Sequence, residues 1–392
     1  MKRICVSFRW PLKIILFVAL LFTSAIAQVS APSLPTRAET TPPPKVLPST
    51  NSRLPWHWPE ARNYSSLVYD TTEKALLLIS GQDASYGLVP SIWSFNPGNR
   101  SWRYVADWQP QDFDMAAFDS SSGKVIVYVS WYFRSTGDVV SETWAFDPKT
   151  ATWENRFPVE SPPPGLCGCG AQVAYDEQAR KIVMFGGLDV SQLFKCFSNG
   201  CDDAGWLACE TNDTWVYDYS GNRWTKMPRP ADENLIPSRR NSHGLTYDRR
   251  AHRIILFGGG DLFGPATDTW AYDYVTNTWT NLQPVVSPPG REYGYLAYDP
   301  TADKTVLFGG IGYDSNSEWL LPAETWNYDL KTNTWKLRTP ARTPSARGWQ
   351  AMAYSDKANA VVIFGGGVDR QHPTDETWLY RTGANKWWQV EP

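Results

Sequence analysis

Six copies of one tryptophan-centred phrase dominate this chain of 392 residues. The copies follow one pattern: an apolar segment that in most copies ends near a glycine pair, a long gap, a phrase close to Thr-Trp-x-Tyr-Asp, a short turn, and a second tryptophan nine residues after the first. The first tryptophans are Trp93, Trp144, Trp215, Trp270, Trp326 and Trp378; the second are Trp102, Trp153, Trp224, Trp279, Trp335 and Trp387. Neighbouring copies are 51 to 56 residues apart, except for one interval with an insertion of about 20 residues, a period longer than helical solenoid repeats have. One supersecondary unit is therefore built six times.

The fourth copy shows the internal order of the repeat. Apolar segments at residues 244–247, 253–257, 269–272 and 278–280 are separated by two tight polar turns and one longer loop. The second segment is continuously apolar in most copies, which is expected where both faces of a sheet are covered. Turns such as Asp218 to Asn222 have hairpin chemistry. The pattern predicts four short strands per copy, with the neighbouring copies covering each sheet.

The paired glycines, the tyrosine and the spaced tryptophan resemble the kelch repeat over residues 56–392. This resemblance implies an all-β fold, a six-bladed β-propeller of four-stranded antiparallel blades, of the kind found in the central domain of galactose oxidase. The first two copies depart from the pattern, with Ser80-Gly81 and Ser130-Trp131 at the glycine pair and Ile92 before the first tryptophan. The predicted blades span about residues 60–105, 112–157, 168–228, 240–283, 291–338 and 347–390.

Each copy holds its four strands in order, so the sequence shows no strand exchange that would close the ring. The segment at residues 55–59 resembles a stray fourth strand and could contribute to closure.

The N-terminus has the design of a cleaved secretory signal. Residues 1–27 combine a basic start, an apolar run and a small-residue exit, and this run is short for a membrane anchor. Residues 28–55 are rich in Pro, Ser and Thr and are predicted to be a disordered linker. We therefore expect a protein that is secreted, cell-surface or periplasmic, with no integral membrane association after cleavage.

Net charge argues against nucleic acid as a partner. Four of the 37 basic residues and none of the 40 acidic residues lie in the signal, which leaves a mature charge of about 33 − 40 = −7. Nucleic-acid binding requires clustered positive charge instead. We predict a monomeric propeller with a protein or glycan partner.

The cysteines concentrate in the third copy. Cys5 lies in the signal, and export favours disulfide bonds among the others, whereas a zinc site is the alternative. An odd number leaves one thiol unpaired or paired with another chain, and the connectivity cannot be read from the sequence. The disulfide candidates are Cys167, Cys169, Cys196, Cys201 and Cys209.

Loop lengths predict which face binds a ligand. Connections after the first and third strands are tight, whereas those after the second and fourth strands are long, so binding residues are expected on the long-loop face. Arginines shortly before the first strands could present guanidinium groups to a carboxylate or phosphate, or they could pair with carboxylates of the loops. The candidate ligand-binding residues are Arg62, Arg239, Arg240, His243, Arg291, Tyr293, Tyr313, Trp319, Arg347, Trp349, Arg370 and His372.

The tryptophans and glycines of the repeat have a scaffold interpretation, and signs of catalysis are few. We predict a binding protein without a metal or cofactor. The alternative is a carbohydrate-active enzyme on the same face, either similar in outline to the bacterial sialic acid mutarotase, a sugar epimerase, or less plausibly a copper-dependent oxidase related to galactose oxidase. Glycosylation sequons occur at Asn63, Asn99 and Asn212 and matter only if the source glycosylates exported proteins.

Overall fold

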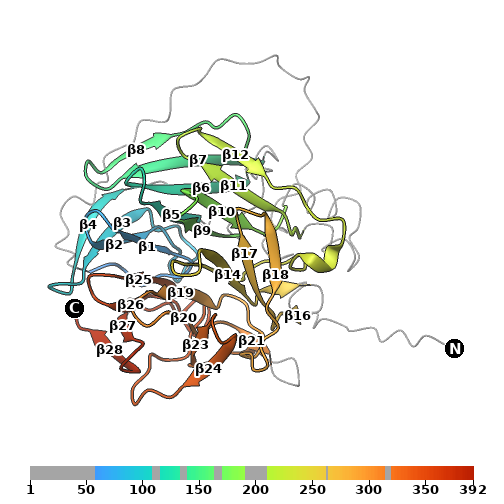
Figure 1. The fold of residues 1–392 in the computed structure, drawn as a ribbon. Helices are drawn as coiled ribbons and strands as arrows, with labels where there is room; N and C mark the ends of the chain where they lie inside the picture. The colour runs from blue at the N-terminus through green and yellow to red at the C-terminus, as the bar shows by residue number, and fades with distance from the viewer. Residues whose placement is uncertain are drawn as a thin grey trace, which may run out of the picture. The chain divides into compact units, whose positions relative to one another are not determined.

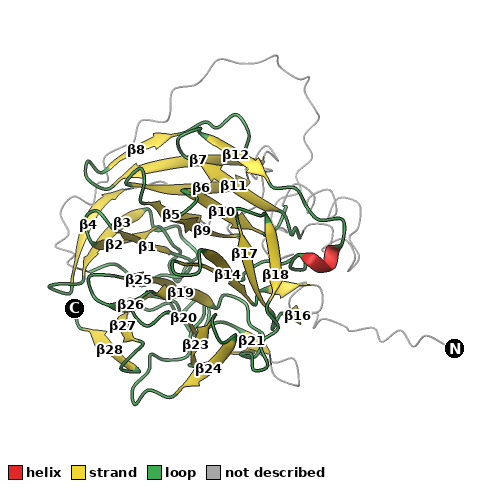
Figure 2. Cartoon of the chain, in the orientation of Figure 1, coloured by secondary structure: helices red, strands yellow, loops and turns green. Residues whose placement is uncertain are grey.

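The chain folds as an all-β propeller. The computed structural model describes residues 58–107, 115–132, 139–162, 170–189, 210–261, 264–313 and 319–392. They form six four-stranded antiparallel sheets and two small two-stranded hairpins (Figures 1 and 2). The predicted fold class and number of blades are confirmed. The described part of the chain contains one short 3-10 helix, η1 (Glu233–Leu235), and no helix long and apolar enough to cross a membrane.

Each blade uses four strands that are consecutive along the chain, apart from the two inserted hairpins. Blades 1 to 3 consist of β1 (Ser66–Asp70), β2 (Ala75–Ile79), β3 (Ser91–Asn96), β4 (Ser101–Asp107); β5 (Met115–Asp119), β6 (Lys124–Tyr132), β7 (Val139–Asp147), β8 (Thr152–Asn155); and β9 (Gln172–Asp176), β10 (Lys181–Phe185), β11 (Thr214–Asp218), β12 (Arg223–Lys226). Blades 4 to 6 consist of β13 (Gly244–Asp248), β14 (Arg253–Phe257), β17 (Thr269–Asp273), β18 (Thr278–Asn281); β19 (Tyr295–Asp299), β20 (Lys304–Phe308), β23 (Thr325–Asp329), β24 (Thr334–Arg338); and β25 (Ala351–Ser355), β26 (Ala360–Phe364), β27 (Thr377–Arg381), β28 (Lys386–Val390). The added hairpins are β15 (Gly260–Asp261) with β16 (Gly264–Pro265), and β21 (Gly312–Tyr313) with β22 (Trp319–Leu320).

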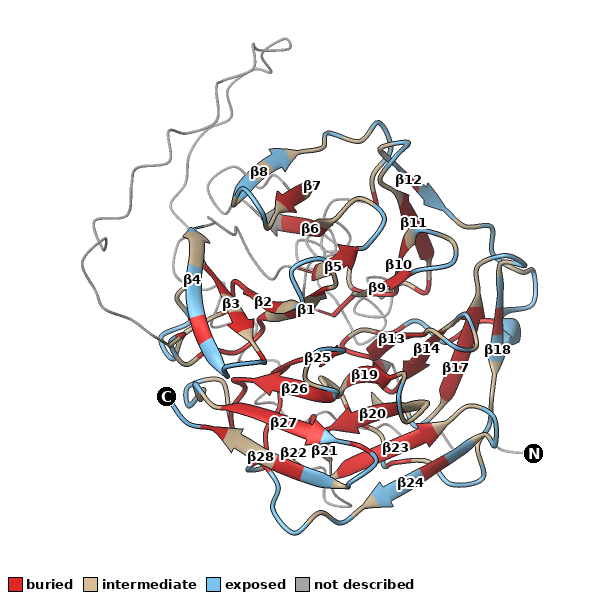
Figure 3. Cartoon of the chain, turned by 60° about the vertical axis from the view of Figure 1, so that its left-hand side comes forward, coloured by how far each residue is buried: buried red, intermediate tan, exposed pale blue. Residues whose placement is uncertain are grey.

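The first strand of every blade lines the axis of the ring. These strands contact one another in the closed order β1, β5, β9, β13, β19, β25 and back to β1. Figure 3 shows them near the centre, with the fourth strands at the rim. A central cavity of about 190 Å³ is lined by all six first strands. The ring therefore has two ends, one built from long loops and the other from tight turns.

Burial follows position within the blade. Second strands such as β20 and β26 are almost wholly buried, whereas the fourth strand β24 buries only Trp335, because it lies at the edge of its sheet. The tryptophans of the phrase pack in apolar clusters that join neighbouring blades, such as Trp335 of blade 5 against Phe257 of blade 4 at 5.0 Å between ring centroids. The scaffold interpretation of these tryptophans agrees with this packing.

The ring closes without strand exchange. Blade 1 consists of strands 1 to 4 in sequence order, and β1 contacts β25 of blade 6. The Trp102 indole donates a hydrogen bond to Thr377 Oγ1 at 2.9 Å. Trp58 donates to the carbonyl oxygen of Asp375 at 2.7 Å and packs its ring against Trp102. The segment at residues 55–59, which was predicted to help closure, thus contributes Trp58, and Trp58 belongs to no strand. Residues 55–57 of this segment lie outside the described part of the chain.

Glycine pairs join neighbouring blades on the long-loop face. Gly309 and Gly310 follow β20 with φ angles of 65° and 101°, a region that glycine adopts without strain. The N–H of Gly310 donates to the carbonyl oxygen of Arg347 in the next blade at 3.0 Å. A Cβ atom on Gly309 would lie 2.5 Å from that same carbonyl oxygen. The paired glycines therefore serve close backbone packing between blades, as their repetition indicated.

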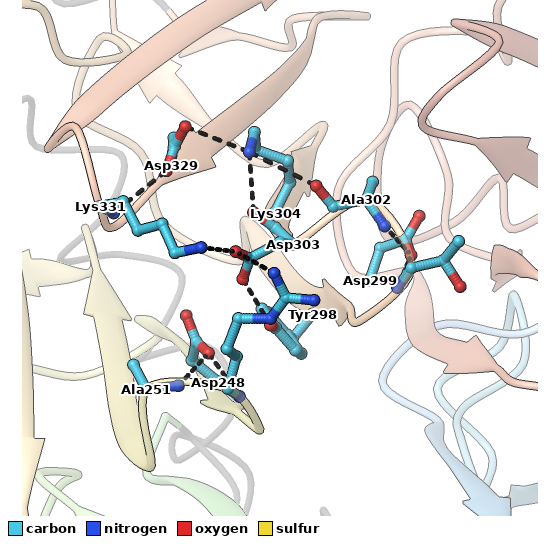
Figure 4. Close-up of polar contacts among 11 residues, drawn as sticks. Asp248, Ala251, Tyr298, Asp299, Ala302, Asp303, Lys304, Asp329 and Lys331 are labelled. Carbon is cyan, nitrogen blue, oxygen red and sulfur yellow. Dashed lines mark hydrogen bonds and ion pairs between the residues drawn. The ribbon is translucent and has the colours of Figure 1, made fainter.

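Buried aspartates hold the opposite, tight-turn face together. Asp299 ends β19 and accepts hydrogen bonds from the N–H groups of Thr301 at 2.9 Å and Ala302 at 3.0 Å (Figure 4). Nearby, the Tyr298 hydroxyl donates to Asp303 at 2.8 Å, and Lys331 pairs with the same carboxylate at 3.2 Å. At the end of the cavity, Arg249 of blade 4 pairs with Glu177 of blade 3 and Asp356 of blade 6. The polar groups of this face largely satisfy one another.

Candidate functional site

The arginines expected at the channel mouth lie inside the scaffold. Arg62, Arg240, Arg291 and Arg347 are all buried, with at most 2% of their surface exposed. In each, one guanidinium N–H donates to the carbonyl oxygen 18 residues later, at 3.0–3.1 Å, which belongs to the glycine-pair region of the same blade. In each, Nε also donates to the carbonyl oxygen two residues earlier. These contacts staple the loop before the first strand to the end of the second strand.

Carboxylates complete these buried arginine sites. Arg240 pairs with Asp268 at 2.6 Å, Arg291 with Glu324 at 2.9 Å, and Arg347 with Glu376. Burial by itself would raise the pKa of Asp268, but hydrogen bonds from Arg240 and the Trp270 indole outweigh it and hold that pKa below its usual value. The alternative interpretation, in which loop carboxylates neutralise the arginines, therefore describes these residues. We assign the four arginines to the scaffold because each guanidinium is buried and bonded to carbonyl groups of its own blade, which corrects the expected placement.

Three further candidates have separate environments. Arg239 is exposed beside its buried neighbour Arg240. His243 is 1% exposed and packs edge-on against Phe185, and burial lowers its pKa to about 3, so the imidazole is neutral. His372 is exposed and contacts Asp369 at 2.8 Å. Only Arg239 and His372 of these could meet a partner directly.

Aromatic residues from three blades meet at the long-loop end of the axis. Tyr64 of blade 1, Tyr293 of blade 5 and Trp349 of blade 6 have ring centroids 5.8–6.0 Å apart. Blades 1 and 5 are not adjacent in the ring, so the contact between Tyr64 and Tyr293 places this group at the axis. We call these three residues the aromatic cap. The predicted candidates Tyr293 and Trp349 are thus brought together.

The backbone fixes the aromatic cap. Tyr64, Tyr293 and Trp349 have φ angles of 59°, 52° and 60°, an uncommon conformation for bulky residues that the ring enforces. The N–H of Tyr64 donates to the carbonyl oxygen of Trp349 at 3.0 Å, and that of Tyr293 donates to the carbonyl oxygen of Ser242 at 2.7 Å. Blades 3 and 4 place Gly170 and Ser242 in this layer, joined by a bond at 2.7 Å. The cap therefore occupies the side of the ring formed by blades 5, 6 and 1.

Two charged side chains lie at the edge of the aromatic cap. The Arg370 guanidinium lies 5.5 Å from the centroid of the Tyr64 ring and 5.9 Å from that of Trp349, in the range of cation–π contact. Glu292 is half-buried, and its carboxylate makes no hydrogen bond to the residues that the structure describes. Burial raises the pKa of Glu292 to about 7, with partial opposition from Arg370. At neutral pH this carboxyl group is divided between its charged and neutral forms.

An exposed apolar hairpin stands beside the cap. Trp319 and Leu320 of β22 are 50% and 49% exposed, and Trp319 lies 6.4 Å from Trp349 between ring centroids. Tyr313, another candidate, lies on the partner strand β21 opposite Trp319. Further exposed apolar side chains come from the corresponding loops of blades 1 and 6: Tyr86, Leu88 and Val368. Grouped exposed apolar side chains mark interaction surfaces more often than scattered ones do.

Several predicted sites are placed differently or not described. Asn63 and Asn212 are buried, and their amides donate to the carbonyl oxygens of Arg370 and Pro237, so the folded protein leaves no room for a glycan on either. Asn99 is exposed in a turn and keeps its predicted role as an acceptor. All the disulfide candidates, at 167, 169, 196, 201 and 209, lie outside the described residues, as do the signal and the linker. Where the chain is described, no group of His, Cys, Asp and Glu could hold a metal ion.

Comparison with known proteins agrees with this geometry. Residues 200–392 match the family model described as the KLHDC2/KLHL20/DRC7 Kelch-repeats domain. Six blades carry the spaced tryptophans and four of them the glycine pair, and together with this match they decide the family. The chain is a kelch-repeat β-propeller. The finer likeness to the galactose oxidase type remains a prediction.

Two curated relatives of this kelch propeller differ in kind. This chain is 26% identical over 231 residues to "Kelch domain-containing protein 1" of Mus musculus. The match covers 56% of this chain and 53% of the mouse protein. It is 25% identical over 308 residues to "Xyloglucanase" of Hypocrea jecorina (strain QM6a), covering 74% of this chain and 32% of the fungal protein. The chain thus spans about half the length of the first relative and about a third of the second. The activities of these whole proteins do not transfer by similarity alone.

The sequence contained a signal for the aromatic cap that went unused. An aromatic residue stands two positions after the buried arginine in three copies, at Tyr64, Tyr293 and Trp349. The arginine drew the functional interpretation, whereas the structure turns the arginine inward and directs the aromatic residue to the axis. Glu292, between Arg291 and Tyr293, is one of the loop carboxylates that the sequence offers as partners for the arginines.

Proposed function

We propose that this kelch propeller is an exported binding protein that recognises a protein partner through the surface over blades 5, 6 and 1. One observation carries the proposal: the exposed Trp319 and Leu320 stand directly beside the aromatic cap. A kelch propeller fits a protein-binding role, and the rigid ring holds these loops in place. The partner remains to be identified.

The chemistry of this surface suits a protein. Tryptophan, tyrosine and arginine are the residue types that contribute most binding energy at interfaces, and here Trp319, Tyr293 and Arg370 lie together. Apolar side chains around them provide area from which a partner can exclude water. Arg370 and Glu292 supply one charge of each sign at the rim, which favours a partner with complementary charges.

A carbohydrate ligand is the second candidate, with the chain acting as a sugar-binding protein or a carbohydrate-active enzyme. Glu292 favours it, since a carboxyl group whose pKa is about 7 can both accept and donate a proton near neutral pH. The relative named as a xyloglucanase gives limited support because only part of it is matched. We rank this candidate second because most of the exposed side chains beside the cap are apolar.

Export, disulfide bonding of the third blade and the monomeric state belong to the same proposal. The N-terminal residues 1–27 support export, and the cysteines at 167–209 support disulfide formation in an oxidising compartment. Intact-mass measurement of secreted protein, with and without reductant, tests the first two features, and size-exclusion chromatography tests the third. We expect a chain that begins near Gln28, gains two hydrogens per reduced disulfide, and elutes as a monomer.

Affinity capture from the native extracellular medium tests the proposed function. The wild-type propeller is compared with the double variant Trp319→Ser and Leu320→Ser, and with Val275→Ser as a matched control. Val275 is also an exposed apolar residue, at 77%, but lies in a tight turn at the other face. We expect a defined protein that the double variant retains at least about tenfold less well than the other two.

A glycan array in parallel separates the two candidates. Binding of a sugar that is lost in Glu292→Gln and in the double variant, with no protein captured, would replace the protein partner with a glycan. Capture that is equal for all three proteins would contradict the choice of this surface.

A further inference from the structure

Three kinds of side-chain hydrogen bond recur between neighbouring blades. In the first kind, the second tryptophan of a blade donates its indole N–H to the threonine that precedes the first tryptophan of the blade before it. The bonds measure 2.8–3.0 Å and join Trp102 to Thr377, Trp224 to Thr143, Trp279 to Thr214, Trp335 to Thr269 and Trp387 to Thr325. Five of the six seams, including the closure between blades 6 and 1, carry this bond.

The second kind uses the tyrosine of the first strand at the tight-turn face. Its hydroxyl reaches the turn of the preceding blade: Tyr69 accepts from the N–H of Lys357, Tyr175 from Ser121 and Tyr247 from Gln178, whereas Tyr354 contacts the Thr301 hydroxyl. At the seam between blades 4 and 5, the Tyr298 hydroxyl donates to Asp303 of its own blade, and Asp303 pairs with Arg250 of blade 4 at 3.0 Å. Again five seams are joined at this level.

The third kind uses polar side chains in the turn between the third and fourth strands. Asn222 and Asn277 donate to the carbonyl oxygens of Arg156 and Pro228 in the preceding blades, as Asn333 does to Leu282. Between blades 5 and 6, Arg338 donates to Asn385 at 3.4 Å. At the closure a different pair takes this place: Lys357, in the turn between the first and second strands of blade 6, donates to Asn96 at the end of β3 at 2.9 Å. The same five seams therefore have a further polar link.

The seam between blades 1 and 2 has apolar residues at all three positions. Ile92 stands where the threonine would accept, Phe118 replaces the tyrosine, and Ala151 replaces the asparagine. All three pack in one apolar cluster with Val127 and Phe146. Isoleucine, phenylalanine and alanine offer no polar atom on their side chains, so none of the three links can form here. Among the described residues of this seam, apolar packing takes the place of these three links.

We propose that the ring opens at the seam between blades 1 and 2, and not at the seam between blades 6 and 1 where the two ends of the repeat region meet. Hydrophobic contact is non-directional, so two apolar surfaces can shift slightly over each other. A hydrogen bond fixes the position of one blade against the next and is lost when the blades shift. The proposal concerns the scaffold and holds whatever ligand the propeller binds.

Thiol labelling of buried cysteines measures opening seam by seam. Val127 lies in the seam between blades 1 and 2, and Val183 occupies the second strand of blade 3 in the seam between blades 3 and 4; both side chains are 0% exposed. Val127→Cys and Val183→Cys are each introduced into the full chain and labelled under native conditions. Peptide mass spectrometry separates these two sites from the natural cysteines. We expect Cys at 127 to react at least about tenfold faster, because each net hydrogen bond contributes roughly fivefold.

Restoring and removing the links makes the comparison reciprocal. Adding Ile92→Thr, Phe118→Tyr and Ala151→Asn is expected to slow labelling at 127 towards the rate at 183. Adding Thr214→Val, Tyr247→Phe and Asn277→Ala is expected to speed labelling at 183. Hydrogen exchange of the otherwise unmodified chain gives an independent readout, in which β5 should be less protected than β13. Equal labelling at the two seams, or restoration that leaves labelling at 127 unchanged, would overturn the proposal.

Discussion

At the scale of single residues, one pair of neighbouring arginines separates scaffold from surface. Arg240 donates to the carbonyl oxygen of Gly258 and to both oxygens of Asp268, whereas Arg239 is exposed. Arg240→Ala removes these bonds and leaves the partly buried Asp268 carboxylate with the Trp270 indole but no counter-charge, so we expect a loss of about 3 kcal/mol in the free energy of unfolding. Arg239→Ala should cost less than about 0.5 kcal/mol. Urea denaturation of the two variants checks this; similar losses would contradict the scaffold assignment.

Glu292 predicts a pH dependence of the opposite sign to that of an ion-paired carboxylate. Burial raises its pKa in the folded protein to about 7, above the ordinary 4.5. The contribution of the Glu292 carboxyl group to the free energy of unfolding is fully present below its pKa in the unfolded chain. It is lost as the pH rises through about 7. We expect Glu292→Gln to gain stability relative to wild type as pH increases from 5 to 8, as measured by thermal unfolding in a pH series.

Glu324 provides the matched control for Glu292. Burial would raise its pKa, but hydrogen bonds from Trp326 and Arg291 hold it below the usual value. The Glu324 carboxylate therefore stabilises the folded protein at pH values above its pKa in the unfolded chain. This stabilisation is lost as the pH falls through its pKa in the folded protein. Glu324→Gln should therefore lose stability across pH 5–8, with little change over that range. A flat difference between wild type and Glu292→Gln would show that Glu292 titrates normally.

At the scale of elements, the glycine pair of blade 5 is a place where backbone geometry strongly favours glycine. Gly309→Ala combines a φ of 65° with a Cβ placed 2.5 Å from the carbonyl oxygen of Arg347. We expect a loss of about 2–4 kcal/mol, since left-handed strain and a backbone clash add. Gly383→Ala is the control, because its Cβ would meet nothing within 4 Å. Calorimetry should show a lowered transition for Gly309→Ala only.

Elements also differ in how well the sequence predicted them. The second strands and the tight turns were placed correctly because continuous apolar runs and turn residues are local signals. The hairpins β15–β16 and β21–β22 were not predicted, since strands of two residues have no periodicity. They form in the loops after Gly259 and Gly310, next to the bridges that pair Gly260 with Asn241 and Ile311 with Glu292 within the same blades.

At the scale of the whole molecule, the closure between blades 6 and 1 uses the same tryptophan–threonine bond as the internal seams. Thr377→Val removes the acceptor of Trp102, and Thr269→Val removes that of Trp335. Both threonines are fully buried, so we expect equal losses of about 1–2 kcal/mol. Equilibrium unfolding checks this; a much larger loss for Thr377→Val would mean that closure is the weak point of the ring.

The sequence by itself determined the repeat, the number of blades, the family and the face on which the long loops lie, because these depend on local spacing repeated six times. The tertiary structure decided the direction of each side chain within that frame. It turned Arg62, Arg291 and Arg347 inward to buried carbonyl groups and carboxylates. It also brought Tyr64 and Trp349, 285 residues apart in the chain (349 − 64), into contact at the axis. Contacts between residues so far apart in the chain form only when the ring closes, and local sequence patterns do not show how it closes.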